Sequence, residues 1–283
     1  MTFAPPEALI DGKLMIDTLR HVRPSEFVAV PRVYEKFKEM IETKIRESSS
    51  VVKWLYEHAR AIGYGNTVAQ MEDERAPFGY SFAKITILSR IKKELGLDRV
   101  ERAYFGAAPM SGETKKFFMS LGLPLMNVYG LSETSGAATY MDPPDITLEK
   151  SGRALPGTQI KIFNPDEQGN GEICIRGRNV FMGYLNNPEA TFEVMDSEGY
   201  FHTGDIGCID PKTGFLDITG RIKELIVTAG GENVSPIPIE VALMEACPII
   251  SHAIVIGDER KYLTALLTLK GVLEKNGRES KTS

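Results

Sequence analysis

Three short segments of the chain carry residues whose types and spacing suit nucleotide chemistry. The first, Asn127–Thr134, brings Tyr129, Gly130, Ser132 and Glu133 together in one octapeptide. An aromatic ring can stack on a base, and a glycine lets the backbone approach a phosphate. A hydroxyl can donate to a phosphate oxygen, and a carboxylate suits Mg²⁺, which prefers oxygen ligands. This octapeptide alone does not exclude an ordinary polar turn.

The second segment is Tyr200–Asp205. An ionised Asp205 offers two acceptor oxygens and can take both hydroxyls of a ribose diol. On the hexapeptide alone, an aspartate in a turn at a strand end explains the pattern equally well. His202 has no partner beside it in the sequence, so we expect it to support the structure rather than act as a catalytic base.

The third segment runs over residues 220–240 and combines basic residues with paired glycines. Arg221 and Lys223, at a domain junction, can hold a phosphate. Gly230 and Gly231 allow the backbone to line a narrow channel. A plain domain linker is the alternative interpretation.

The elements that must position these segments change in type along the chain. Apolar spacing predicts helices at residues 31–48, 51–63 and 82–95, the last one ending at Gly96. A strand at 100–105, a helix capped by Ser111 and a strand at 125–129 then form a parallel α/β unit. Both glycine-containing loops therefore leave the carboxyl ends of strands, where open α/β sheets bind ligands.

The later part of the chain has a different pattern. Residues 151–219 alternate short strands with Gly, Pro, Asn and Asp, which predicts a small antiparallel sheet or distorted barrel. A helix at 236–247 and strands at 252–256 and 262–269 predict a compact α+β module beyond a junction at residues 220–221. We therefore expect one domain over 1–219, whose part 151–219 is mostly β, a second over 220–270, and a disordered tail at 271–283.

Composition excludes several functional classes. The chain has 283 residues, a net charge of −5 and 25% charged residues, which indicates about two globular domains and gives no footprint for nucleic acid. Its three widely spaced cysteines lack metal-type spacing and favour a reducing compartment, with the cytosol as default. No apolar run reaches the length of a membrane span. Peripheral attachment to the endoplasmic reticulum or another membrane stays open.

Together, in this order, the motifs resemble those of the adenylate-forming superfamily of acyl-CoA synthetases, adenylation domains and luciferases. Gly106–Pro109 is similar to the superfamily's adenine-side loop, and Tyr129–Thr134 to its nucleotide and magnesium loop. Gly171–Tyr184 resembles its structural Gly-Glu…Gly-Tyr motif, Thr203–Asp205 its ribose-binding motif and Gly220–Leu225 its hinge motif. The resemblance covers residues 1–270. Segments at 30–36, 95–109 and 222–234 resemble the bubblegum-type long-chain acyl-CoA synthetases.

The resemblance implies a fold, a reaction and site residues. The fold would be α/β: part of a synthetase large domain, with α/β layers and a small barrel-like sheet, followed by a truncated α+β C-terminal domain. The reaction would join a fatty acid to coenzyme A, consuming ATP with Mg²⁺. Gly106, Ala107 and Tyr129 would hold adenine. Ser132 would bind the α-phosphate, with Gly130 beside it, and Glu133 would bind magnesium. Asp205 would bind the ribose, and Arg221 would reach the nucleotide. Lys223 would lie at the hinge, and Gly230 and Gly231 would line the pantetheine path.

Two expected elements of the superfamily have no match here. The Ser/Thr/Gly-rich phosphate loop would lie upstream of residue 1, and the catalytic lysine of the small domain beyond residue 270. The segment Pro211–Gly214 superficially resembles the surroundings of that lysine, but a turn explains it better. We therefore expect a piece of a longer ligase that forms little acyl-adenylate alone, which a pyrophosphate-release assay would test. Two alternatives stay open: a non-catalytic nucleotide- or acyl-binding relative, and an adenylation enzyme for another carboxylic acid.

Overall fold

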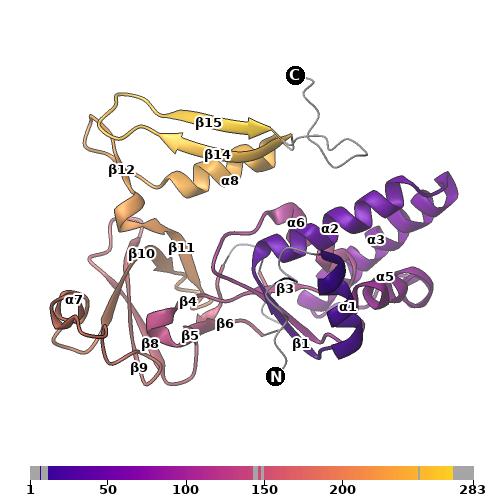
Figure 1. Ribbon diagram of the computed structural model, residues 1–283, viewed down its shortest axis with the longest axis horizontal. Helices are drawn as coiled ribbons and strands as arrows, with labels where there is room; N and C mark the ends of the chain where they lie inside the picture. Colours follow the sequence, from indigo (N-terminus) through magenta and orange to yellow (C-terminus); the bar gives the residue numbers. More distant parts are fainter. Residues whose placement is uncertain (1–6, 8–11, 143–145, 148–149, 248, 270–283) are drawn as a thin grey trace. The chain divides into compact units, whose positions relative to one another are not determined.

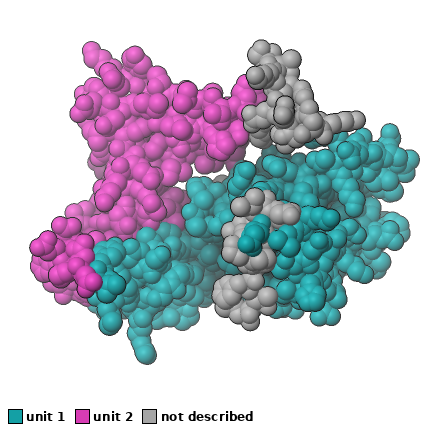
Figure 2. All heavy atoms as spheres, viewed as in Figure 1, with its two compact units in different colours: residues 1–159, 176–185, 210–216 teal, residues 160–175, 186–209, 217–283 magenta. Residues whose placement is uncertain are grey.

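The chain divides into two compact units, coloured separately in Figure 2. The computed structural model describes all residues except 1–6, 8–11, 143–145, 148–149, 248 and 270–283. Unit 1 comprises residues 1–159, 176–185 and 210–216, and unit 2 comprises residues 160–175, 186–209 and 217–283. The tail predicted at 271–283 lies outside the described residues.

Unit 1 contains most of the helices and a small parallel sheet (Figure 1). Its helices are α1 (Gly12–Val22), α2 (Pro31–Arg46), α3 (Ser50–Met71), α4 (Tyr80–Ala83), α5 (Ser89–Leu95) and α6 (Gly112–Ser120). A π-helical turn, Lys84–Leu88, joins α4 to α5. The expected helix at 82–95 is therefore present, and it ends at Gly96 with φ 73° in the left-handed conformation.

Helix α2 shows how the sequence builds the core of unit 1. Pro31 occupies the first turn, where its missing N–H costs no hydrogen bond. Val33, Phe37 and Ile41 recur at helical spacing and are buried, as expected. Tyr34 is also fully buried, and its ring meets Phe118 of α6 edge-on at 5.2 Å between centroids. Helices α2, α3 and α6 thus pack on one another around an aromatic core.

Helix α3 extends well beyond the expected end at residue 63. It continues to Met71 because Gly63 packs against α6 rather than stopping the helix. A Cβ at Gly63 would lie 2.1 Å from the backbone oxygen of Ser120. The glycine therefore serves close helix packing, a role that local sequence pattern does not distinguish from that of a helix terminator.

The sheet of unit 1 has the strand order β1-β2-β3, with both pairs parallel. The strands are β1 (Glu26–Ala29), β2 (Arg102–Phe105) and β3 (Leu125–Asn127). Helix α6 connects β2 to β3, which confirms the predicted strand–helix–strand unit. Ser111 caps α6 by accepting a hydrogen bond from the Thr114 backbone N–H at 3.2 Å. Strand β1 lies in the part of the chain that we expected to be mainly helical.

Short strand pairs follow β3 in unit 1. Strands β4 (Gly130–Leu131) and β5 (Gly136–Ala137) form one antiparallel pair, and β6 (Thr139–Tyr140) and β7 (Arg153–Ala154) form another. Between β4 and β5, residues Ser132–Thr134 form one 3₁₀ turn. These pairs stabilise the segment that leaves the carboxyl end of β3.

The predicted β region is a four-stranded sheet in the order β11-β10-β9-β8. Its strands are β8 (Thr158–Phe163), β9 (Gly171–Gly177), β10 (Phe201–Ile209) and β11 (Leu216–Arg221), and helix α7 (Pro188–Val194) precedes β10. Strands β9 and β10 pair antiparallel, with a register shift between His202 and Ile206. That irregularity lies at the predicted ribose motif.

The last part of unit 2 contains the expected α+β elements. They are β12 (Ile226–Val227), β13 (Asn233–Val234), α8 (Pro236–Ala246), β14 (Ile250–Ile256) and β15 (Thr264–Leu269). Strands β14 and β15 pair antiparallel, and α8 packs on β14. Every residue of β15 is exposed.

Candidate functional site

The turn after β3 carries four of the predicted site residues. Thr134 fixes this turn because its fully buried hydroxyl reaches two backbone groups. Its Oγ1 accepts from the Leu131 N–H at 2.9 Å and lies 2.8 Å from the Gly136 carbonyl oxygen, to which it donates. Ser132 is exposed on the same 3₁₀ turn, and Glu133 is half-buried. The hydroxyl and the carboxylate are therefore presented from a turn whose backbone is held in place.

Tyr129 and Gly130 are more enclosed than the sequence suggested. Only 8% of Tyr129 is exposed, so most of its ring is covered by the protein itself. Its backbone N–H donates to Thr139 Oγ1 at 3.0 Å. A Cβ on Gly130 would lie 1.8 Å from the Gly136 carbonyl oxygen. The glycine at this position is therefore required by the β4–β5 pair, whatever ligand it approaches.

Glu133 has a partner that the sequence did not single out as a site residue. Its Oε1 accepts a hydrogen bond from the Tyr184 hydroxyl at 2.9 Å. Burial and this hydrogen bond raise the pKa of Tyr184. The Phe181 backbone N–H also donates to the Glu133 carbonyl oxygen at 2.8 Å. Residues 181–184 thus orient the proposed metal-binding carboxylate.

The loop after β2 lies beside this turn. Because β2 and β3 are neighbouring parallel strands, their carboxyl ends meet at one edge of the sheet. A Cβ on Gly106 would lie 2.6 Å from the Val128 carbonyl oxygen, so the two strand exits touch. Ala107 has φ 67°, in the left-handed region that side chains rarely adopt. The structure therefore brings Gly106 and Ala107 together with the turn after β3.

In unit 2, Asp205 and Arg221 form an ion pair. The Arg221 Nε donates to Asp205 Oδ1 at 2.9 Å. Asp205 is 5% exposed, although the Arg221 side chain is largely exposed. Asp205 lies on the irregular part of β10, and Arg221 ends the neighbouring strand β11. The two residues predicted to contact ribose and nucleotide are thus adjacent.

The remaining predicted residues lie just after Arg221. Lys223 is exposed in the 3₁₀ turn Ile222–Glu224. Gly230 and Gly231 lie in the turn between β12 and β13, where the Gly231 N–H donates to the Thr228 carbonyl oxygen at 2.8 Å. Gly231 has φ 79°, so this turn requires left-handed backbone there.

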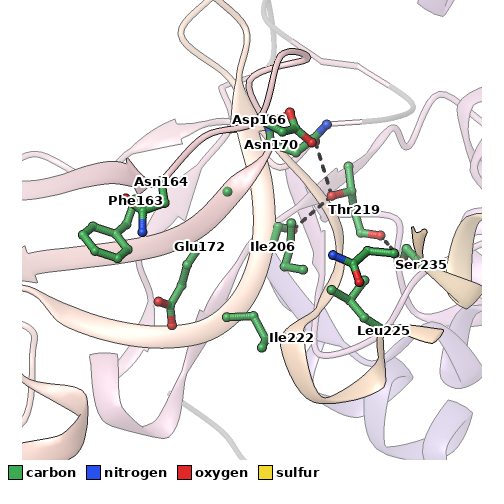
Figure 3. A pocket seen from close by; sticks show the side chains of 12 residues that line it. Phe163, Asn164, Asp166, Asn170, Glu172, Ile206, Thr219, Ile222, Leu225 and Ser235 are labelled. Carbon is green, nitrogen blue, oxygen red and sulfur yellow. Dashed lines mark hydrogen bonds between the residues drawn. The ribbon is translucent and has the colours of Figure 1, made fainter. Parts of the chain in front are cut away.

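A depression of about 540 Å³ opens on unit 2 (Figure 3). It is lined by Phe163, Asn164, Asp166, Asn170, Gly171, Glu172, Ile206, Thr219, Ile222, Leu225, Asn233 and Ser235. The Thr219 hydroxyl lies 3.4 Å from both Asn170 Oδ1 and the Ile206 carbonyl oxygen, and the Ser235 hydroxyl donates to the Thr219 carbonyl. None of the predicted site residues lines this depression, so it does not identify their ligand.

The ligand contacts of all these residues stay predictions. Asp205 and Arg221 belong to unit 2, whereas the strand-exit loops belong to unit 1. Within the part of the chain that the structure describes, no helix has the length and apolar character needed to span a membrane.

Comparisons with known proteins bear on both units. Long-chain-fatty-acid–CoA ligase ACSBG2 of Gallus gallus is 46% identical over 96% of this chain. Long-chain-fatty-acid–CoA ligase ACSBG1 of Mus musculus is 44% identical over 96% of the chain. The chain spans 35% and 37% of the length of these relatives.

Solved structures support the fold. The o-succinylbenzoate CoA synthetase MenE of Bacillus subtilis, in complex with its acyl-adenylate intermediate, has a TM-score of 0.63 at 22% identity. That match covers 95% of this chain and 45% of MenE. The α/β fold of an adenylate-forming synthetase, with part of a C-terminal domain, is thereby confirmed.

Two family models match separate parts of the chain. Residues 223–282 match the AMP-binding enzyme C-terminal domain. Residues 1–185 match the AMP-binding enzyme family. Because this longer match includes both strand-exit loops and covers more than half of the sequence, the chain belongs to the family of AMP-binding enzymes.

Proposed function

We propose that this chain is the nucleotide-handling part of a long-chain-fatty-acid–CoA ligase. One observation carries the proposal: identity of 44–46% to ligases of that name runs over 96% of the chain, a span that takes in the candidate residues of both units. The alternative of another carboxylic acid has weaker support. MenE, named for o-succinylbenzoate, is only 22% identical and indicates the fold alone.

The proposed reaction has two steps. In the first, the fatty acid carboxylate attacks the α-phosphorus of ATP, which forms an acyl-adenylate and releases pyrophosphate. In the second, the thiol of coenzyme A attacks the acyl carbon and AMP leaves. Forming the mixed anhydride converts a poor leaving group into a good one, and fixed charges near the α-phosphate lower the barrier.

The residues of unit 1 suit the base and the phosphate. Gly106 and Ala107 would contact the adenine edge through backbone groups, and the small exposed part of Tyr129 would meet the ring. Ser132, exposed on its turn, would donate to an α-phosphate oxygen. Glu133 fits Mg²⁺ because it is a hard oxygen donor whose carboxylate is oriented by Tyr184. Mg²⁺, when bound, would neutralise charge on the phosphates.

The residues of unit 2 suit the ribose and the moving domain. Asp205 would accept hydrogen bonds from both ribose hydroxyls, which fits a carboxylate already oriented by Arg221. Arg221 would contact the same nucleotide. Lys223, in the next turn, would be the hinge residue about which residues beyond it rotate between the two steps. Gly230 and Gly231 would let pantetheine pass close to the backbone.

The partners follow from the same proposal. The substrates would be a long-chain fatty acid, ATP and coenzyme A, and nucleic acid would have no part. We expect a cytosolic protein, and peripheral attachment to the endoplasmic reticulum or another membrane is the alternative. Fractionation of cells that express the tagged chain tests the location.

The central test is AMP binding by isothermal titration calorimetry on the full 283-residue chain. We expect saturable binding and a loss of about tenfold or more in affinity for Asp205→Asn, since hydrogen bonds to a charged group contribute about 1.5–3 kcal/mol. Glu198→Gln is the matched control, because Glu198 pairs with Lys161 at the surface of the same unit. An unsubstituted chain that binds no AMP would overturn the proposed function.

A further inference from the structure

Strand β10 contains an irregularity at the residue proposed to bind ribose. Opposite β9, the register passes from His202↔Cys174 to Ile206↔Glu172. One residue of β9, Ile173, is thus matched by three on β10, so β10 bulges over Thr203, Gly204 and Asp205. Bulges commonly aim a side chain away from the regular direction of a strand.

One side chain of β9 bonds to this bulge at two points. Glu172 Oε2 lies 2.7 Å from His202 Nδ1, and Glu172 Oε1 accepts from the Gly204 N–H at 3.0 Å. Since an ionised carboxylate only accepts, the His202 Nδ1 carries the proton in this bond. Glu172 therefore bonds both to the last paired residue before the bulge, His202, and to Gly204 within it.

The backbone of the bulge is closed by further hydrogen bonds. Gly204 has φ 72°, in the left-handed region that glycine adopts without steric cost. The Thr203 hydroxyl donates to the Ile173 carbonyl oxygen at 2.7 Å, and the Asp205 N–H donates to Thr203 Oγ1 at 3.0 Å. Phe163 packs edge-on against the His202 ring at 5.1 Å. The direction of Asp205 thus depends on groups fixed by β9.

The same region has the composition of a metal site, since ligand atoms of Glu172, Cys174 and His202 lie within 4.8 Å of one another. Two observations favour a hydrogen-bonded network instead. The 2.7 Å between Glu172 and His202 is a hydrogen-bond distance. The Cys174 side chain is fully buried, and its Sγ lies 3.8 Å from the Glu172 carbonyl oxygen, to which it donates. The cluster therefore has an internal use for its polar groups without an ion.

We propose that Glu172 and His202 are positioning residues that set the β10 bulge and thereby aim Asp205 at the ribose diol. This inference rests on the proposed function and adds the residues that determine recognition of the sugar. In this proposal, Glu172 and His202 act on AMP binding without touching the nucleotide. Their effect reaches it through the hydrogen bonds to Gly204 and through the direction of Asp205.

Calorimetry with AMP and 2′,3′-dideoxy-AMP tests whether Glu172 affects binding through the ribose hydroxyls. For Glu172→Ala we expect AMP affinity to fall about tenfold, near the value of one hydrogen bond to a charged group, and 2′,3′-dideoxy-AMP affinity to stay unchanged. The loss should disappear in an Asp205→Ala background, because the pair acts through that residue. Glu172→Gln, whose amide can still bond to Gly204, should restore most of the affinity. A loss that is equal for both ligands overturns the inference.

A ligand-independent measurement keeps the two proposals distinguishable. Hydrogen exchange of the Gly204 amide, followed by nuclear magnetic resonance, should speed up in Glu172→Ala and stay slow in the control Glu198→Gln. Unchanged Gly204 exchange would overturn the inference whether or not AMP binds, whereas absent AMP binding with protected Gly204 would overturn only the proposed function. If Glu172→Ala does not fold, the same measurements are made on Glu172→Asp, whose shorter side chain moves the carboxylate away from Gly204. Loss of AMP affinity on chelation of Zn²⁺ would instead favour a metal site and overturn the inference.

Discussion

The two units hold their candidate ligand-binding segments by different means. In unit 1, the turn after β3 is fixed by backbone contacts and by the buried hydroxyl of Thr134. In unit 2, the bulge of β10 is fixed by an ionisable side chain, Glu172, from the neighbouring strand. The first arrangement depends on close packing and on the hydrogen bonds of an uncharged hydroxyl, and the second on the hydrogen bonds of an ionisable carboxyl group. The turn after β3 should therefore tolerate the loss of a charge but not an added side-chain atom. The bulge of β10 should tolerate an added side-chain atom better than the loss of a charge.

The largest effect should come from Gly130→Ala in unit 1. The added Cβ would overlap the Gly136 carbonyl at 1.8 Å, so the β4–β5 pair must open. We expect a loss of about 3 kcal/mol in the free energy of unfolding, as for severe overpacking, measured by urea denaturation. Gly204→Ala is the counterpart in unit 2, where φ is 72° and no atom lies within 4 Å of the new Cβ.

For Gly204→Ala we expect a loss of only about 1 kcal/mol, the cost of left-handed backbone for alanine. Equal losses for the two glycine substitutions would contradict the contrast between a shape-dependent turn and an open bulge.

The sequence predicts the positions of these segments better than the contacts that hold them. The β2–α6–β3 unit follows from local signals: apolar strands, the Ser111 cap and loops at strand ends. The site contacts are not local. Tyr184 reaches Glu133 across 51 positions, and His202 reaches Glu172 across 30. Such pairs depend on strand pairing and register, which spacing along one chain does not give.

One signal for these contacts was nevertheless present in the sequence. Glu172 and Tyr184 are the named residues of the Gly-Glu…Gly-Tyr motif, for which the resemblance indicates a structural role. In the structure they contact the two candidate segments, Glu172 the β10 bulge and Tyr184 the carboxylate of Glu133. The motif thus supports one candidate segment in each unit. The Gly63 packing contact, in contrast, has no such signal.

A second, smaller effect should follow from Thr134→Val. Valine keeps the size of the side chain but removes the hydroxyl, which leaves the Leu131 N–H and the Gly136 carbonyl without this partner. Because Thr134 is fully buried, we expect a loss of about 2 kcal/mol in unfolding free energy. Thr18→Val is the control, since the Thr18 hydroxyl bonds to the exposed helical carbonyl of Leu14. A similar loss of unfolding free energy in both variants would contradict the explanation that the buried Thr134 hydroxyl fixes the turn.

Ala107→Gly should act in the opposite direction. Ala107 has φ 67°, and glycine adopts this conformation without the steric cost that alanine carries. The gain is partly offset by the greater freedom of glycine in the unfolded chain, so we expect about 0.5 kcal/mol of added stability. Ala108→Gly, next to it and without positive φ, should destabilise instead. Destabilisation by both would show that the loop after β2 has no backbone strain to relieve.

The smallest effect should be a pH dependence at the partly buried ion pair between Lys150 and Asp210 of unit 1. It sharpens the comparison because the turn that begins at Asp210, unlike the turn after β3, depends on charge. Lys150 donates to Asp210, and the backbone N–H groups of Lys212 and Thr213 also bond to that carboxylate. These hydrogen bonds hold the pKa of Asp210 well below its ordinary value of 3.8. The folded chain therefore binds its proton at lower pH than the unfolded chain does.

Stability from Asp210 should accordingly be complete above about pH 4 and decline as the pH falls below it. Asp210→Asn keeps an acceptor oxygen for the two backbone N–H groups but removes the charge. Its melting temperature should thus lie below that of the unsubstituted chain at pH 6, and the difference should shrink towards pH 3. A difference that is constant from pH 6 to pH 3 would mean that the ion pair with Lys150 contributes nothing to folding, and that unit 1 depends on shape at this turn as well.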